Sequence, residues 1–440
     1  AYEIPKRDWS SDVCSSDLAI EQGRKIGAKS QRERDYLEAV AAYYQDFAQR
    51  PERSRQESRA KAYEALSSRY PDDDEAQIFY ALYLAGTQSQ ADQTYAAYLK
   101  AATMLEKQFV KYPDHPGVAH YLIHSYDAPP IAKEGLNAAR RYASIAPEAP
   151  HALHMPSHIF TRVGAWEESI ATNKRSAEAA IKGGEPDESY HASDYSVYAA
   201  LQLARDAEAK RIMDDAIKVT GANPARSTAY YATAAMPARL ALERGAWAEA
   251  ARLTIAKSRF SYVDALTWYA RALGSARTGN PDAADKDAEQ LASIHKELLK
   301  ENNNYWATEV EIQRLAAAGW TALARGNRES AIKLMRAAAD LEDKNEKHIV
   351  TPGRMLPARE LLGDMLMELK QPSQALNEYE TSQLREPNRF RGYLGAARAA
   401  EAAGNQTKAR DYYAKLVALA KNADTQRPEL AHAREYLARR

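Results

Sequence analysis

A short pattern recurs along this chain, in places at a spacing of 34 residues, and it constrains the fold more than any other feature. In each copy, glycine or another residue of a turn is followed a few positions later by alanine or serine, which opens an apolar stretch of helical periodicity. Ala375 and Ala409 are 34 positions apart, and so are Pro113 and Pro147. Such a period indicates repeats that bury their apolar faces only against their neighbours. The copies are GAWEES (164–169), ARDAEA (204–209), GAWAEA (245–250), GNPDAA (279–284), GNRESA (326–331), KQPSQA (370–375) and GNQTKA (404–409).

The composition agrees with helices. Alanine, glutamate, arginine, leucine and lysine dominate, valine and isoleucine are sparse, and 45% of the residues are hydrophobic, which is enough for a large core. Lys+Arg and Asp+Glu are equal at 60 each, so no net field draws the chain to nucleic acid or to an anionic membrane. The uncharged apolar runs are too short to span a bilayer. We therefore expect no nucleic-acid partner and no membrane span.

The N-terminal segment 1–18 differs from the rest of the chain. DWSSDVCSSDL, from Asp8 to Leu18, contains the only cysteine, Cys14, and matches the translation of a common sequencing-library adapter. We interpret residues 1–18 as an assembly artefact and expect them to be unstructured. The remaining chain lacks cysteine, so neither disulfides nor thiol catalysis applies. The true N-terminus is then expected to be missing, which leaves both a cytoplasmic and an exported, periplasmic location open.

The 34-residue helix–turn–helix unit resembles the tetratricopeptide repeat over roughly residues 19–440. The best match is the unit 358–388. It carries the small residue, alanine, aromatic and terminal proline of that repeat at Gly363, Ala375, Tyr379 and Pro387. HPGVAHYLIHSYDAP and HALHMPSHIF, together with C-terminal segments such as LPARELLGD, further resemble a group of bacterial tetratricopeptide-repeat proteins. That resemblance supports the fold and implies no reaction.

The resemblance implies an all-α, right-handed superhelical solenoid of tetratricopeptide-like helix–turn–helix repeats, with about ten helix pairs. We expect His-rich units at 116–200, regular repeats at 356–423 and a capping helix at 424–440. GGEPDESYH (183–191) and HIVTPGRMLP (348–357) interrupt the period and are expected to be insertions. In such a repeat the first helix of each pair lines a concave groove.

Histidines concentrate on three of the expected groove helices, and six of the ten lie between His115 and His158. Spacings of three and four residues place side chains on one helical face. Neighbouring helices pack about 8–10 Å apart, so side chains from two helices can hold one ion. The three helices carry, in order, His120 and His124; His151, His154 and His158; and His191, Asp194 and Tyr198.

One interpretation is a metal site. Imidazole and carboxylate ligands suit Zn, Fe, Cu or Ni, and a metal with an open position can activate water. Two of the histidines, His154 and His191, could also act as acid and base without a metal. The candidate ligands are His120, His124, His154, His158, His191 and Asp194.

The interpretation that we favour from sequence is a non-enzymatic scaffold that binds a peptide or protein segment in the groove. Whether the protein is an enzyme, which ligand it binds and how it oligomerises stay open. The candidate groove contacts are His151, Arg162, Tyr198, Arg239, Glu360 and Asp364.

The two interpretations predict different geometry. A metal site should bring three or more ligand atoms within about 4–5 Å of one another, because ligand bonds are about 2 Å long. Carboxylates such as Asp127 should then orient the rings. A scaffold should splay its histidines toward solvent. Pro156 affects both cases, because it either kinks a continuous helix or begins a new one and leaves His151 and His154 in the preceding turn.

Overall fold

The computed structural model describes the backbone of residues 9–439 and the side chains of residues 18–439. In these residues every regular element is a helix, so the all-α class is confirmed. The chain divides into two compact units, 1–126 and 127–440, and each is described by itself. The boundary falls inside the stretch 116–200 that we expected to be part of a single array. No helix of the described residues is long and apolar enough to cross a membrane.

The first unit has an aromatic core. Tyr63 of α3 and Tyr80 of α4 are buried, and the Tyr63 ring centroid lies 4.6 Å from that of Tyr83. At the start of α2, Ser30 Oγ accepts from the Glu33 N–H and the Glu33 carboxylate accepts from the Ser30 N–H, which satisfies two free donors of the helix end. The helices are α1 (Trp9–Ile26), α2 (Gln31–Tyr44), α3 (Glu52–Arg69), α4 (Asp74–Ala85), α5 (Ala96–Lys111) and α6 (Pro116–Tyr126).

Helix α1 extends into the segment that we expected to be unstructured. Its backbone is helical from Trp9 onward, so that expectation does not describe residues 9–18. Helix formation is cooperative, and adding residues to a helix already formed over 19–26 costs less than starting one. A helical backbone can therefore continue into such a segment whatever its origin. Residues 1–8 lie outside the described residues.

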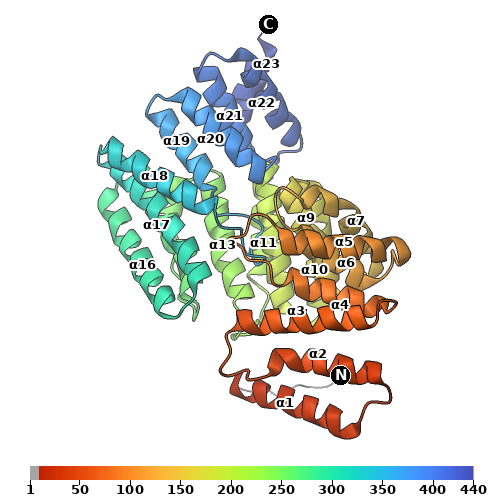
Figure 1. The fold of residues 1–440 in the computed structure, drawn as a ribbon. Helices are drawn as coiled ribbons and strands as arrows, with labels where there is room; N and C mark the ends of the chain where they lie inside the picture. Colours follow the sequence, from red (N-terminus) through yellow and green to blue (C-terminus); the bar gives the residue numbers. More distant parts are fainter. Residues whose placement is uncertain (1–8, 440) are drawn as a thin grey trace. The chain divides into compact units, whose positions relative to one another are not determined.

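The second unit continues the helical order (Figure 1). It begins with η1 (Ala132–Gly135), a single 3₁₀ turn. The α-helices that follow are α7 (Leu136–Ile145), α8 (Pro150–His154), α9 (Pro156–Val163), α10 (Trp166–Gly183), α11 (Pro186–Gln202), α12 (Asp206–Ala216), α13 (Thr228–Glu243), α14 (Trp247–Ala250), α15 (Ser261–Arg277), α16 (Pro281–Lys300), α17 (Asn304–Ala324), α18 (Arg328–Glu342), α19 (Ala358–Glu368), α20 (Pro372–Arg385), α21 (Phe390–Ala402), α22 (Gln406–Leu419) and α23 (Pro428–Ala438).

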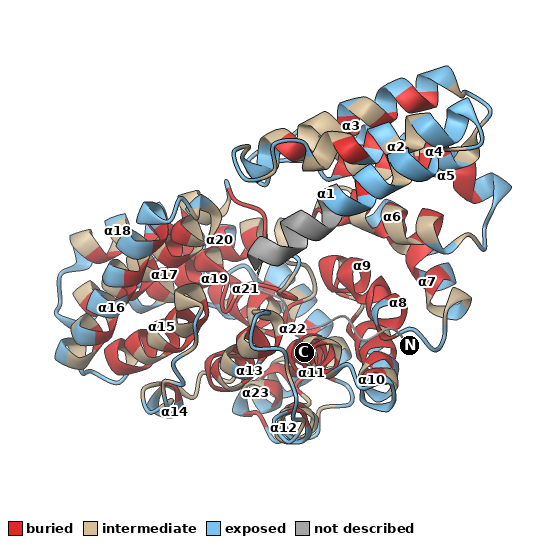
Figure 2. Ribbon diagram, turned by 90° about the horizontal axis from the view of Figure 1, so that it is seen from below, coloured by how far each residue is buried: buried red, intermediate tan, exposed pale blue. Residues whose placement is uncertain are grey.

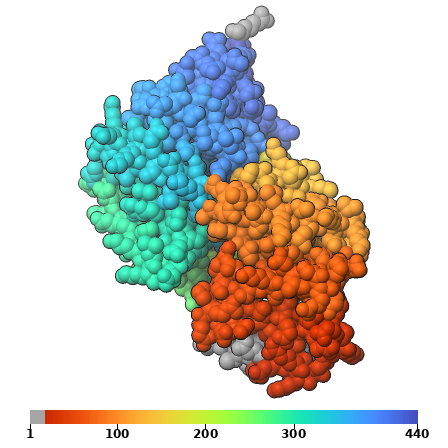
Figure 3. Space-filling view, viewed as in Figure 1, coloured from red at the N-terminus to blue at the C-terminus, as the bar shows by residue number. Residues whose placement is uncertain are grey.

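The C-terminal helices form regular pairs, and the expected repeat residues lie at their contacts. The buried Tyr379 ring of α20 packs between Gly363 of α19 and Gly395 of α21. A Cβ at these glycines would lie 2.7 Å and 2.2 Å from ring atoms, so only glycine lets the three helices approach this closely. Ala375 is fully buried in the same layer. This packing confirms the tetratricopeptide-like solenoid, and Figure 3 shows α16 to α23 as one uninterrupted surface on the face drawn.

The inner helices α9, α11 and α13 are buried along nearly their whole length, while α16 and α18 keep exposed faces (Figure 2). Residues 345–357, which include the expected insertion 348–357, cover α11 and α13. The Tyr195 hydroxyl donates to Ile349 O at 2.9 Å. A Cβ at Gly353 would lie 2.4 Å from the Tyr198 hydroxyl. The other expected insertion, 183–191, is a turn at Gly184 followed by the start of α11.

The C-terminal end of the second unit returns to α12. The Asp424 carboxylate accepts from the N–H groups of Ala207 at 3.0 Å and Glu208 at 2.7 Å, which lie in the first turn of α12. Such N–H groups have no partner within their own helix. Trp166 Nε1 likewise donates to Asn388 O at 2.7 Å. The C-terminal part of the unit therefore packs back against α10 and α12, and much of the inner surface that we expected to be an open groove is covered.

Candidate metal centre

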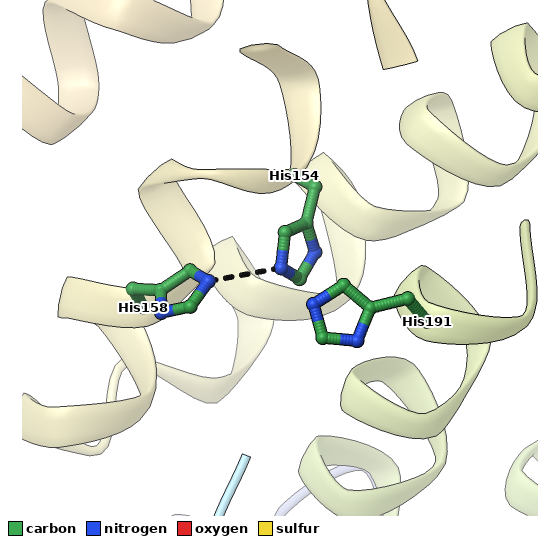
Figure 4. Close-up of side chains that lie close together, drawn as sticks. All are labelled: His154, His158 and His191. Atoms are coloured by element: carbon green, nitrogen blue, oxygen red, sulfur yellow. Dashed lines mark hydrogen bonds between the residues drawn. The ribbon is translucent and has the colours of Figure 1, made fainter. Parts of the chain in front are cut away.

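Three histidines of the second unit face one another (Figure 4). His154 ends α8, His158 lies in α9, and His191 lies in the second turn of α11. One ring nitrogen from each lies within 4.8 Å of those of the other two. His154 and His158 are 0% and 2% exposed, and His191 is partly exposed. These rings converge and are not splayed toward solvent.

The break at Pro156 leaves the first two histidines on one face. Helix α8 ends at His154 and α9 begins at Pro156, but Met155 between them keeps the helical values φ −51° and ψ −38°. A proline at the first position of a helix gives up no hydrogen bond that the helix would make. Residues i and i+4 stay neighbours, so His154 Nε2 lies 3.1 Å from His158 Nε2.

The Nδ1 atoms of His154 and His158 already serve as donors. Asn173 Nδ2 donates to Ser169 O at 2.8 Å, so Asn173 presents its Oδ1 to His154 Nδ1 at 2.7 Å and accepts. His158 Nδ1 lies 3.0 Å from the Asp127 carboxylate, which only accepts when ionised. In neutral rings the two Nε2 atoms therefore carry lone pairs that face each other. Two acceptors at this distance repel unless a proton or a metal ion lies between them.

Burial disfavours the proton. Desolvation, together with the neighbouring His191 and His158, holds the pKa of His154 well below its ordinary value. Burial also lowers the pKa of His158, against the attraction of Asp127. For His191, burial and His158 lower the pKa to about 3. The three rings are thus neutral near pH 7, and neutral imidazole is the form that binds metals.

Asp127 fixes the orientation of the His158 ring. Besides accepting from His158, it accepts from Arg162 Nε at 2.7 Å and lies 3.9 Å from Lys347 Nζ. Burial alone would raise the pKa of Asp127, but Lys347 and Arg162 hold it well below its ordinary value, so the carboxylate is ionised. Burial lowers the pKa of Lys347 to about 8. A carboxylate that accepts from the outer N–H of a histidine is the usual way in which metal-binding imidazoles are oriented.

Other predicted ligands lie outside this cluster. Asp194 accepts from Arg239 Nε at 2.9 Å, because a buried carboxylate is stabilised by the nearest buried cation. Burial nevertheless raises the pKa of Asp194. His120 and His124 lie in α6 of the first unit, with their Nε2 atoms 3.1 Å apart. They form a second i, i+4 pair, and their role in metal binding remains a prediction.

Four of the predicted groove residues are buried within the second unit, namely Arg162, Tyr198, Arg239 and Glu360. They belong to polar networks: Arg389, for example, donates from Nε to Glu360 at 2.7 Å and from Nη1 to the Tyr198 hydroxyl. The covering segment 345–357 and the return of the C-terminal helices account for this burial. His151 is exposed, with Nδ1 3.4 Å from the Glu188 carboxylate, and Asp364 lines a cleft.

Two residues of the site were not found from the sequence. Asn173 lies in α10 and belongs to no motif; the only signal is a polar amide within a helix, where asparagine is disfavoured. Lys347 directly precedes the expected insertion 348–357. A lysine at such a place is ordinarily solvated, so nothing in the sequence announces that it is buried.

No protein-family model and no curated protein matches the chain. Among solved structures, the chain is similar to one in the hetero-tetramer of Cut9 and Hcn1 of the APC/C, at 11% identity and a TM-score of 0.29, over 96% of this chain and 98% of that one. It is also similar to one in the structure of Naa15/Naa10 bound to HypK-THB, at 12% identity and a TM-score of 0.31, over 92% of this chain and 66% of that one. Likenesses this loose carry no argument about the site or its partners.

Proposed function

We propose that the second unit binds one transition-metal ion through His154, His158 and His191. The observation that carries the proposal is the pair of Nε2 atoms 3.1 Å apart, in rings whose Nδ1 atoms already donate to Asn173 and Asp127. If a metal ion lay about 2.0 Å from both nitrogens, the N–metal–N angle would be about 100°, close to the tetrahedral value.

His191 supplies the third ligand after a small movement. In a tetrahedral site with bonds of about 2.0 Å, ligand atoms are about 3.3 Å apart, whereas the three nitrogens here lie within 4.8 Å of one another. As a whole residue, His191 is the least buried of the three. Three neutral imidazoles suit Zn, Cu, Fe and Ni. A metal held by three histidines keeps a fourth position for water, whose pKa it lowers, which is the chemistry of metal-assisted hydrolysis.

Metal analysis of the purified chain tests the proposal. After reconstitution with Zn, Fe, Cu or Ni and removal of loosely held ions, we expect a His154→Ala/His158→Ala variant to retain about one equivalent less than the parent. The matched control is His432→Ala, because His432 lies on α23 and contacts Glu401. Circular dichroism checks that each variant is folded. Equal metal content in the parent and the double variant would reject the site.

A second candidate function, an interaction scaffold for a peptide or protein segment, is supported by a different feature. A cleft of about 910 Å³ opens beside α21, and the predicted groove residue Asp364 lines it. Since most of the other predicted groove residues are covered, this cleft is where a segment would dock. Its volume is at the upper end of the range for small-molecule sites, which suits an extended chain.

Amide hydrogen exchange tests the scaffold function. Extended hexapeptides of varied composition are added to the full chain, and exchange is followed in α19 and α21. We expect slower exchange in these two helices, and not in α16 or α18, with at least one peptide. Unchanged exchange in α19 and α21 with every peptide would reject this function and would leave the metal proposal unaffected.

A further inference from the structure

The cleft beside α21 has walls from eight helices. Residues of α12, α13, α14, α15, α19, α20, α21 and α23 line it, together with residues 425–427. We call it the α21 cleft. Phe390, Leu394 and Met367 give it an apolar part, and Phe390 and Leu394 are buried. A site of this kind binds apolar side chains as well as polar groups.

One face of α21 runs along the cleft. Arg391, Leu394, Gly395 and Arg398 all line it, and their spacing of three, four and seven residues places them in a row on the helix. From Arg391 to Arg398 the row is about 10 Å long at 1.5 Å per residue. In an extended peptide, side chains on the same face recur about every 7 Å. The two arginines thus lie at the two ends of a short apolar stretch.

Most carboxylates of the α21 cleft already have arginine partners within the unit. Glu243 accepts from Arg389 Nη2 at 2.8 Å, and Asp206 accepts from Arg427 Nε at 3.0 Å. In the same way Asp364 is paired with Arg391, and Glu368 with Arg277. Glu429 also lines the cleft and is partly exposed. The negative charge of the walls is therefore largely neutralised.

Two arginines of α21 have donors for which the described residues supply no acceptor. Arg391 Nε is buried and has no acceptor among the described residues, although Nη2 of the same side chain contacts Asp364. A buried donor without an acceptor is unfavourable, and a ligand oxygen would satisfy it. Arg398 is exposed and, within the part of the chain that the structure describes, forms no hydrogen bond or ion pair. Both arginines lie in the row on α21.

Trp247 fixes one of these cations. The guanidinium of Arg391 lies 5.7 Å from the Trp247 ring centroid, and that of Arg277 lies 5.0 Å from it. A guanidinium over an aromatic ring is held in position by cation–π attraction. Arg391 is therefore oriented before a ligand arrives, so less side-chain conformational entropy is lost on binding.

We infer that the α21 cleft binds an extended acidic peptide segment, with carboxylates at Arg391 and Arg398 and an apolar side chain against Leu394 between them. The inference rests on the second candidate function and adds the chemistry of the partner. Charge complementarity supports it, because the free donors in the cleft are cationic while its carboxylates are mostly paired. Because every second side chain of an extended segment faces the same side, the segment that fits this row carries an apolar residue two positions after one acidic residue and two positions before the next.

Fluorescence anisotropy of labelled hexapeptides tests the inference on the full chain. The first peptide has glutamate at positions 1 and 5, leucine at position 3 and serine elsewhere, and the second replaces each glutamate with glutamine. We expect the acidic peptide to bind roughly tenfold more tightly than the neutral one, and added salt to weaken its binding. Arg398→Glu should abolish this preference. Arg328→Glu is the control, because Arg328 is an exposed arginine at the start of α18, away from the cleft lining.

The outcomes separate the two levels of the proposal. Equal affinity for both peptides, or an unchanged preference in Arg398→Glu, would overturn the acidic-segment inference and leave the scaffold function standing. Failure of every peptide to bind or to alter exchange in α19 and α21 would remove both. Competition by inorganic phosphate as strong as that by unlabelled acidic peptide would indicate a simple anion site and would also overturn the inference.

Discussion

Arg239 of α13 donates from Nη2 to Thr351 Oγ1 at 2.7 Å, across 112 positions of the chain. The same nitrogen donates to Gly353 O at 3.1 Å, and Nε donates to Asp194. One fully buried side chain therefore joins α13, α11 and the covering segment 345–357. Arg239 was predicted to contact a ligand in the groove, and its donors are instead used by Asp194 and the covering segment.

Replacing Arg239 with methionine should destabilise the protein strongly. The change leaves the Asp194 carboxylate buried without a cation, which typically costs about 3–5 kcal/mol. Urea unfolding at neutral pH measures the loss. An Asp194→Asn/Arg239→Met double variant should recover much of it, because the uncompensated charge is gone. A single variant within about 0.5 kcal/mol of the parent, which is usual for surface substitutions, would contradict the role given to this pair.

Asn173→Ala should weaken metal binding without removing a ligand. Asn173 fixes the proton of His154 on Nδ1, and loss of such an orienting partner typically lowers metal affinity 10- to 100-fold. Competition with a chelator gives the affinity. Asn377→Ala is the control, because Asn377 is an exposed asparagine of α20. Equal affinities for the two variants would refute the argument from ring orientation, even if the histidines bind metal.

The repeat packing could be predicted because its causes are local. The spacing of small and aromatic residues predicts helix pairs, and Gly363, Ala375 and Tyr379 meet at those contacts as the resemblance implied. The i, i+4 spacing likewise predicts that His154 and His158 share a face. Such inferences need only helical geometry and the order of residues along the chain.

The environment of the site depends on contacts that a repeat pattern does not contain. Asn173 reaches His154 from another helix, and Lys347 reaches Asp127 from a segment more than 200 residues away. Asp194 shares its helix with His191, yet it pairs with Arg239 of α13. Which charges become buried together depends on how irregular segments fold back over the helices, and sequence spacing does not specify this.

Gly395→Ala should destabilise the C-terminal repeats. The new Cβ would lie 2.2 Å from the Tyr379 ring, so the ring or helix α21 must move. Overpacking a tight core contact typically costs about 1–3 kcal/mol. Gly86→Ala in the first unit is the comparison, because the nearest atom to a Cβ there is 3.4 Å away. Thermal unfolding of both variants checks this, and equal stability of the two would mean that the contact tolerates a methyl group.

Glu342 should make stability depend on pH. Its side chain is 12% exposed, and burial, only partly offset by Arg354, raises its pKa from 4.5 to about 7. The folded protein then holds this proton more tightly than the unfolded chain. Between pH 4.5 and about pH 7 the unfolded chain has lost this proton and the folded protein still holds it, so the free energy of unfolding falls as pH rises. Above about pH 7 Glu342 is ionised in both states, and the loss of stability stays constant.

Glu342→Gln isolates the loss of stability that comes from ionising Glu342. The Glu342 carboxylate accepts from the Ala358 N–H at 2.8 Å, and glutamine keeps an oxygen that can accept the same hydrogen bond. Relative to the parent, the variant should gain stability as pH rises, by at most about 3 kcal/mol above pH 7 at roughly 1.4 kcal/mol per pKa unit. Urea unfolding from about pH 4 to pH 8 measures the difference. Glu329→Gln, at an exposed position of α18, should show none of this dependence. A difference between Glu342→Gln and the parent that stays constant across the range would show that Glu342 titrates alike in the folded and unfolded states.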